Sequence, residues 1–130
     1  MTEDRNLRAG DVVVVSFPRH TPSGREQEGR RPAVILAVPT GKLRFPVVIL
    51  VPLTTQEGAW VGENPTVYPT IRRGAGGLPL PSVVLLDQIR SVDARRIGGY
   101  LGCLSGQDFS PITSGVRGLI GQSSNDEPSR

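Results

Sequence analysis

The sequence has little of what disulfide and metal chemistry require. Among its 130 residues, Cys103 is the only cysteine and His20 the only histidine. These counts exclude an internal disulfide framework, a cysteine-based zinc cluster and paired-histidine catalysis within one chain. No apolar run approaches the roughly 20 residues that cross a bilayer, and the polar start MTEDRNLRAG is unlike a secretory signal. We therefore expect a soluble, cytoplasmic protein that uses no metal and no cofactor.

Lysine is almost absent as well. Fourteen of the fifteen Lys+Arg residues are arginine, Lys42 being the exception, and the formal net charge is +3. Arginine suits bidentate contact with phosphate and stacking on nucleobases. Biased base composition in the source genome would give the same count. The basic character therefore permits an anionic partner without proving one.

Glycine and proline together supply 28 residues, 16 and 12 respectively, about twice the share of ordinary proteins. This composition favours many short strands joined by turns over long helices. The apolar segments predict strands over residues 11–17, 31–38, 45–53, 66–71, 82–92 and 100–104. The second and third are too continuously apolar for a sheet with one exposed face. We therefore predict a mainly β fold, a small antiparallel barrel.

The remaining segments predict loops and short helices. Residues 18–29 and 55–65 lack periodicity and are expected to form loops, and residues 93–98 one helical turn. Ser110 fits a helix N-cap and Pro111 the first position of a C-terminal helix. Its apolar face would consist of Ile112, Val116, Leu119 and Ile120. We expect one domain over residues 1–121 and a disordered tail over residues 122–130.

Two polar residues stand where apolar strands begin and end. Arg31 starts the second strand and is followed by Pro32, which favours an extended backbone at Arg31. Thr54 ends the third strand. If the two strands pair antiparallel, Arg31 and Thr54 share one rim of the sheet, where a cation and a hydroxyl can bind a phosphate. A solvated strand end and an ordinary threonine are the alternatives.

Asp87 and Gln88 interrupt the apolar segment SVVLLDQIRSV. A buried polar group without a partner costs roughly 1–3 kcal/mol, so the pair must be satisfied internally or face a ligand groove. The pattern alone favours the internal, structural role.

Four segments occur in a recognisable order between Gly10 and about Gly121: GDVVVV, REQEGRRPAVIL, VILVPLTTQ and SVVLLDQIRSVDARRIG. Together they resemble the MazF/PemK family of toxin endoribonucleases. The resemblance implies an SH3-like β-barrel with a C-terminal helix, assembled as a homodimer. It also implies cleavage of single-stranded RNA, mRNA especially, at a short sequence. Neutralisation would come from a MazE-like antitoxin with an acidic disordered tail.

The resemblance also implies roles for individual residues. Arg31 corresponds to the main catalytic group of the family and Thr54 to its catalytic companion. Asp87 and Gln88 match residues that line the base-reading groove, which reverses the structural interpretation given above. The RNA-binding set predicted on this basis is Glu26, Gln27, Thr55, Gln56, Asp87 and Gln88.

The chain departs from the family pattern at three points, one of them a first loop that is longer and more basic, with the segment HTPSGR. Many members continue the second strand into an asparagine or serine that contacts RNA, whereas this chain has Val38 and Pro39 there. That contact is therefore in doubt. Trp60, in the second loop, either stacks on a base or packs over the barrel edge.

RNA carries its own nucleophile, the 2′-OH, so its cleavage needs neither a metal nor a protein nucleophile. Arginine is a poor base because its pKa exceeds about 12, so Arg31 is expected to act by stabilising charge. The expected products carry a 2′,3′-cyclic phosphate and a 5′-OH. Two alternatives remain open, a gyrase-poisoning toxin of the same fold and a non-catalytic nucleic-acid-binding barrel.

Overall fold

The computed structural model describes residues 6–18 and 29–121 of the chain. Glu26 and Gln27, two of the predicted RNA-binding residues, lie outside the described residues, as does the predicted tail. In chain order the elements are β1 (Asp11–Phe17), β2 (Gly29–Ala37), β3 (Val47–Thr54), α1 (Ala59–Glu63), β4 (Thr70–Ile71), η1 (Ala75–Gly77), β5 (Ser82–Val84), η2 (Leu86–Gln88), β6 (Arg90–Asp93), η3 (Ala94–Arg96), β7 (Ile97–Cys103) and α2 (Gly106–Leu119). The η elements are short 3₁₀ helices.

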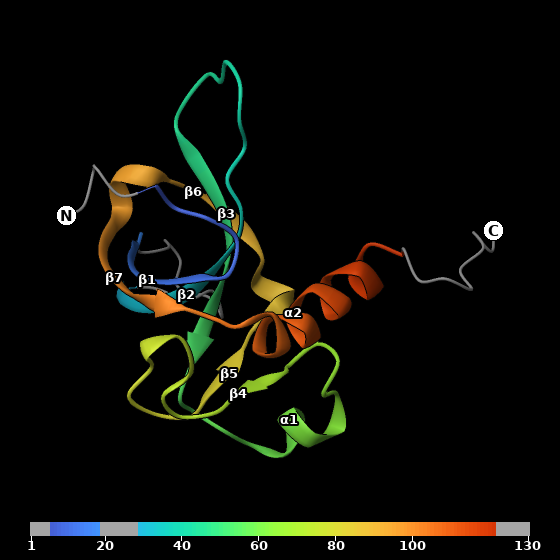
Figure 1. Cartoon of the computed structure of the whole chain (residues 1–130). Coiled ribbons are helices and arrows are strands. Elements are labelled where there is room, and N and C mark those ends of the chain that lie inside the picture. The colour runs from blue at the N-terminus through green and yellow to red at the C-terminus, as the bar shows by residue number, and fades with distance from the viewer. Residues whose placement is uncertain (1–5, 19–28, 122–130) are drawn as a thin grey trace.

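The strands form one antiparallel, strongly curled sheet (Figure 1). Its order is β4-β5-β3-β2-β1-β7, and β6 pairs with the first half of β3. The sheet makes a half-barrel with β4 and β7 at its two ends, and α2 packs beside it as the C-terminal helix. The mainly β fold predicted from the sequence is confirmed.

The core lies on both faces of the curled sheet. One cluster of buried residues consists of Val13, Val15, Phe17, Ala33, Ile35, Val48, Leu50, Val92 and Ile97. The other consists of Val12, Val34, Val51, Leu53, Ile71, Ala75, Leu78, Val84, Leu86, Leu104 and Ile112. Alternate residues of one strand point to opposite faces, so β1, β2 and β3 supply both clusters. This double burial explains why these strands are apolar almost throughout.

The strand predicted over residues 82–92 is wrong in one respect, because η2 divides it into β5 and β6. The cause lies in the pairing with β3. Thr54 faces Val83 on β5, whereas Leu50 faces Arg90 on β6. Four steps along β3 thus match seven steps along the partner, and the three extra residues form the 3₁₀ turn.

The start predicted for the C-terminal helix is also wrong. The N-cap is Ser105, not Ser110, and Pro111 lies inside the helix. The Ser105 hydroxyl accepts the backbone N–H of Asp108 at 3.1 Å and donates to its carboxylate at 3.0 Å, a reciprocal cap of the kind that starts helices. No helix in the described ranges is long and apolar enough to cross a membrane.

Smaller differences concern the short elements. The predicted loop 55–65 contains the five-residue helix α1, and the strand predicted over residues 66–71 is reduced to the two-residue β4. The predicted helical turn near residues 93–98 is confirmed as η3. Its cap is Asp93, whose carboxylate accepts the backbone N–H of Arg95.

Candidate active site

Arg31 and Thr54 belong to neighbouring antiparallel strands. In the pairing of β2 with β3, Ala33 faces Pro52 and Ile35 faces Leu50. The pairing ends at Ala33 and Pro52, and the same register continued by two residues would set Arg31 opposite Thr54. Residues directly opposite on an antiparallel pair project from the same face, with Cβ atoms about 4.5–5.5 Å apart. In that register the two side chains would project from the same face at the end of β3, so the antiparallel pairing is as the sequence argument requires and the shared rim stays a prediction.

A local turn holds the Thr54 hydroxyl. The backbone N–H of Gln56 donates to Thr54 Oγ1 at 3.1 Å, which closes a side-chain turn at the end of β3. A hydroxyl has one proton and two acceptor lone pairs. Accepting from Gln56 uses one lone pair, and the hydroxyl can still donate its own proton to an oxygen of a ligand.

Beside Thr54 the surface is hollowed into an open cavity of about 330 Å³. Its lining residues are Thr54, Gln56, Trp60, Tyr68, Leu85, Asp87 and Gln88. The end of β3 thus meets η2 and α1 around one space. Four residues singled out from the sequence, Thr54, Gln56, Asp87 and Gln88, come together there. Thr55 is exposed next to the cavity but does not line it.

Asp87 is held in this cavity by a residue that the sequence pattern did not single out. The Tyr68 hydroxyl donates to Asp87 Oδ2 at 2.6 Å. This hydrogen bond, together with the negative charge of Asp87, raises the pKa of Tyr68 above its ordinary value of 10.0. The ring of Trp60 meets that of Tyr68 edge to face, with centroids 4.8 Å apart. Trp60 remains 37% exposed, so part of its indole is open to a ligand.

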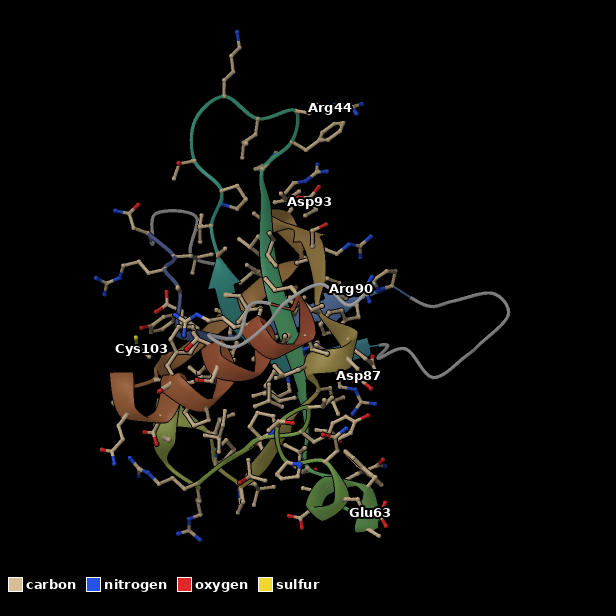
Figure 2. All side chains as sticks on the ribbon, turned by 90° about the vertical axis from the view of Figure 1, so that its right-hand side faces the viewer. Arg44, Glu63, Asp87, Arg90, Asp93 and Cys103 are labelled. Carbon is tan, nitrogen blue, oxygen red and sulfur yellow. The ribbon has the colours of Figure 1, made fainter. Side chains whose placement is uncertain are left out.

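A second cation, Arg90, was also not singled out by the sequence pattern. Its guanidinium lies over the Phe17 ring, 5.1 Å from the centroid. Arg90 faces Leu50, which in turn faces Ile35, so Arg90 projects from the same face of the sheet as Arg31. Figure 2 shows Arg90 and Asp87 on the same side of the molecule. Arg90 follows Asp87 by three residues, so a cation lies one short turn from the cavity that Asp87 lines.

Metal ligands do not gather in the part of the chain that the structure describes. Residues 6–18 and 29–121 hold no group of three or more His, Cys, Asp or Glu side chains that could bind a metal ion. Hydrogen-bonding groups, guanidinium groups and two aromatic rings are what the site offers. This set suits an anionic, aromatic-bearing ligand such as a nucleotide chain.

A half-barrel sheet with a C-terminal helix is the MazF fold. The structure is similar to that of MazF (Form-I) from Deinococcus radiodurans, with a TM-score of 0.68 and 24% sequence identity over 91% of this chain and 99% of that one. It is also similar to MazE-MazF (Form-II) from the same organism, with a TM-score of 0.65 and 25% identity over 92% of this chain and 100% of that one.

Sequence comparison identifies the family. The model of the PemK-like, MazF-like toxins of type II toxin–antitoxin systems matches residues 8–120, and the chain belongs to that family. It is 31% identical to the endoribonuclease MazF of Staphylococcus saprophyticus over 113 residues, and this match covers 85% of this chain and 88% of the relative. It is 35% identical over 102 residues to the endoribonuclease MazF of Staphylococcus epidermidis, covering 76% and 78%. The family predicted from the sequence is confirmed, and the chain is a homologue of MazF endoribonucleases.

Proposed function

We propose that this chain cuts single-stranded RNA at a short sequence, by attack of a 2′-OH on the adjacent phosphate and without a metal ion. The observation that supports the proposal is the antiparallel register of β2 and β3, which continued by two residues would set Arg31 opposite Thr54, a residue that lines one cavity with Asp87 and Gln88. The relatives named endoribonuclease MazF support the same activity.

The chemistry needs little beyond the stabilisation of charge. Attack forms a bond from O2′ to phosphorus and breaks the bond from phosphorus to O5′. The 2′ proton leaves and the 5′ oxygen gains one, which yields a 2′,3′-cyclic phosphate and a 5′-OH. The phosphorane between these states carries extra negative charge, which a fixed guanidinium stabilises. Arg31 has this role, and the Thr54 hydroxyl donates to a phosphate oxygen and orients it.

Base selection falls to the cavity. Its volume of about 330 Å³ is near the lower end of small-ligand pockets and suits one nucleobase. With Asp87 Oδ2 occupied by Tyr68, the second carboxylate oxygen is left to accept from a base amino group, while Gln56 and Gln88 both donate and accept. The substrate must be single-stranded because its bases have to splay out of the stack. Glu26, Gln27 and Thr55 complete the proposed RNA-binding set.

We extend the proposal to partners. One similar structure, with a TM-score of 0.63 and 18% identity over 91% of this chain and 98% of that one, is an endoribonuclease in complex with its cognate antitoxin from Mycobacterial species. A MazE-like antitoxin with an acidic disordered tail would fold along the basic face of this chain and occupy the RNA path. A homodimer would lengthen that path. Light scattering of the purified protein, alone and with the antitoxin, measures both associations.

The direct test is incubation of purified protein with labelled single-stranded RNA, with and without EDTA. We expect cleavage in both samples and fragments with 5′-OH ends. Arg31→Ala should lower the rate by about 10²–10³-fold, the usual cost of losing a group that stabilises the transition state. Arg73→Ala, at another exposed arginine, should leave it unchanged.

Three outcomes would contradict the proposal: loss of cleavage in EDTA, an active Arg31→Ala variant, or RNA that stays intact. Intact RNA with inhibited gyrase would favour the gyrase-poisoning toxin. Salt-sensitive RNA binding without any cutting would favour the non-catalytic barrel.

A further inference from the structure

Two arginines flank Ser16 near the end of β1, Arg30 on the neighbouring strand β2 and Arg96 at the end of η3, directly before the edge strand β7 (Figure 1). Arg30 on β2 faces Ser16 on β1. On the other side of β1, Val15 faces Ile97, and one further residue in the same register sets Ser16 beside Arg96. In agreement, Arg96 Nη1 donates to the Ser16 carbonyl oxygen at 3.5 Å. Arg30, Ser16 and Arg96 thus form one row, here called the Ser16 row.

The Arg30 side chain crosses β1 toward β7. Its Nη1 lies 2.9 Å from the point where a Cβ on Gly98 would stand. Gly98 follows Arg96 by two residues, so the Arg30 guanidinium reaches the start of β7 while the Arg96 guanidinium contacts the Ser16 backbone, and both lie around Ser16. Because successive residues of a strand alternate in direction, Arg30 projects from the face of β2 opposite to Arg31. The Ser16 row is therefore separate from the predicted rim of Arg31 and Thr54.

Among the described residues, few carboxylates lie where they could pair with Arg30 or Arg96. The carboxylate of Asp93 is engaged by Arg95, whose Nε and Nη2 both donate to it. This pairing is the main reason that the pKa of Asp93 falls to about 2, with Arg96 contributing least. The ion pairs of Arg72 with Asp108 and of Arg95 with Asp93 do not include the arginines of the row. Two guanidinium groups on either side of an exposed serine suit an anion from outside the chain.

We propose that the Ser16 row binds a backbone phosphate of the RNA outside the cleaved step, an inference that rests on the proposed function. Arg30 directly precedes Arg31 near the start of β2. An RNA strand that crosses the end of the sheet there can contact Arg31 on one face with one phosphate and Arg30 on the other face with another. Paired guanidinium forks match phosphate geometry, and phosphate contacts position a nucleic acid without reading its sequence. A peptide that folds on binding needs apolar anchors. Among the described residues, none of the exposed large apolar side chains lies on β1, β2, η3 or β7.

The test uses the full chain and an uncleavable single-stranded RNA with every 2′-OH methylated. Fluorescence anisotropy gives its affinity at several salt concentrations for wild type and for the double variant Arg30→Gln/Arg96→Gln. A matched control, Arg73→Gln/Arg117→Gln, removes two exposed charges elsewhere. We expect roughly tenfold weaker binding in the first variant, and a slope of log K against log salt that falls by about 0.7 for each phosphate that is no longer neutralised. The control should change affinity far less.

Gly98→Ala separates position from charge. The new Cβ displaces the end of the flexible Arg30 side chain, and the backbone at Gly98 has no left-handed φ that alanine would resist. Both charges stay, so weaker RNA binding with an unchanged melting temperature would support the site around Ser16.

Equal losses of affinity in the double variant and its control would overturn the inference, as would RNA binding that is unchanged in both. Binding to polyglutamate, an anionic peptide, is measured in the same way. A double variant that loses affinity for polyglutamate but keeps its affinity for RNA would also overturn the inference. If wild type fails to cut RNA but the double variant still loses affinity for the methylated RNA, the phosphate site stands and the proposed cleavage fails.

Discussion

Replacing Gly115 with alanine should destabilise the protein, whereas the same change at Gly118, one turn further along α2, should stabilise it. A Cβ on Gly115 would overlap Leu86 Cδ1 and lie 2.5 Å from the carbonyl oxygen of Thr66. A Cβ on Gly118 would have no neighbour within 4 Å. Gly115 therefore marks the point where α2 approaches η2 most closely, and Gly118 provides a control within the same helix.

The two effects can be weighed against each other. Alanine gains up to about 1 kcal/mol over glycine in a helix interior, and at Gly118 nothing opposes this gain. At Gly115 the added methyl overpacks a filled site, which costs about 1–3 kcal/mol. Leu86 is fully buried and the Thr66 oxygen belongs to the backbone, so neither can move away cheaply. We expect a net loss of up to about 2 kcal/mol for Gly115→Ala, or up to about 8 °C in melting temperature for a domain of this size.

Thermal and urea unfolding followed by circular dichroism measures both variants under the same conditions. A melting temperature raised equally by the two substitutions would refute the close seating of α2 on η2. The contact also has a functional consequence, because Leu86 begins the turn that carries Asp87 and Gln88. At a temperature where both variants are folded, Gly115→Ala should cut RNA more slowly than Gly118→Ala.

Two further predictions concern the cavity. Thr54→Val removes the hydroxyl but keeps the shape of the side chain, so the cleavage rate should fall about 10²-fold. Thr54→Ser keeps the hydroxyl and should stay active. Equal losses of rate in single-turnover assays of the two variants would show that the hydroxyl does not take part in cleavage. Tyr68→Phe frees Asp87 and should broaden the cut-site sequence, determined by sequencing the 5′ ends of fragments from one long RNA. An unchanged cut-site preference would remove Asp87 from base selection. Because the pKa of Tyr68 is raised, its hydrogen bond to Asp87 is fully present below pH 10.0 and is lost only as the pH rises through the folded-state pKa.

The local sequence pattern was sufficient to predict the bounds of a strand that is apolar on both faces. β1 spans residues 11–17 as predicted, because an apolar β-branched run allows little else. The antiparallel pairing of β2 with β3 follows from the sequence and is observed, and the shared rim of Arg31 and Thr54 is its extension by two residues. The role of Tyr68 in the cavity could not be predicted from local pattern, because its hydroxyl reaches Asp87 across 19 residues of chain.

The start of α2 shows two local signals in competition. Ser110 followed by Pro111 fits an N-cap, and Ser105 with Asp108 three residues later also fits one. The earlier cap prevails because it brings Phe109 into the helix, where it packs against a core cluster. Burial of an aromatic side chain contributes more than the backbone hydrogen bond that Pro111 cannot make, but only the tertiary structure shows that the core lies there.

The break between β5 and β6 has a consequence for the site. In an unbroken strand, alternation would turn Asp87 or Gln88 toward a face that is buried in apolar side chains, at a cost of roughly 1–3 kcal/mol for an unpaired polar group. The three extra residues remove that conflict, because the turn that they form carries Asp87 and Gln88 out of the sheet. It also carries them to the end of β3, beside Thr54. The mismatch in pairing that defeats a strand prediction is therefore what supplies the cavity with its polar wall.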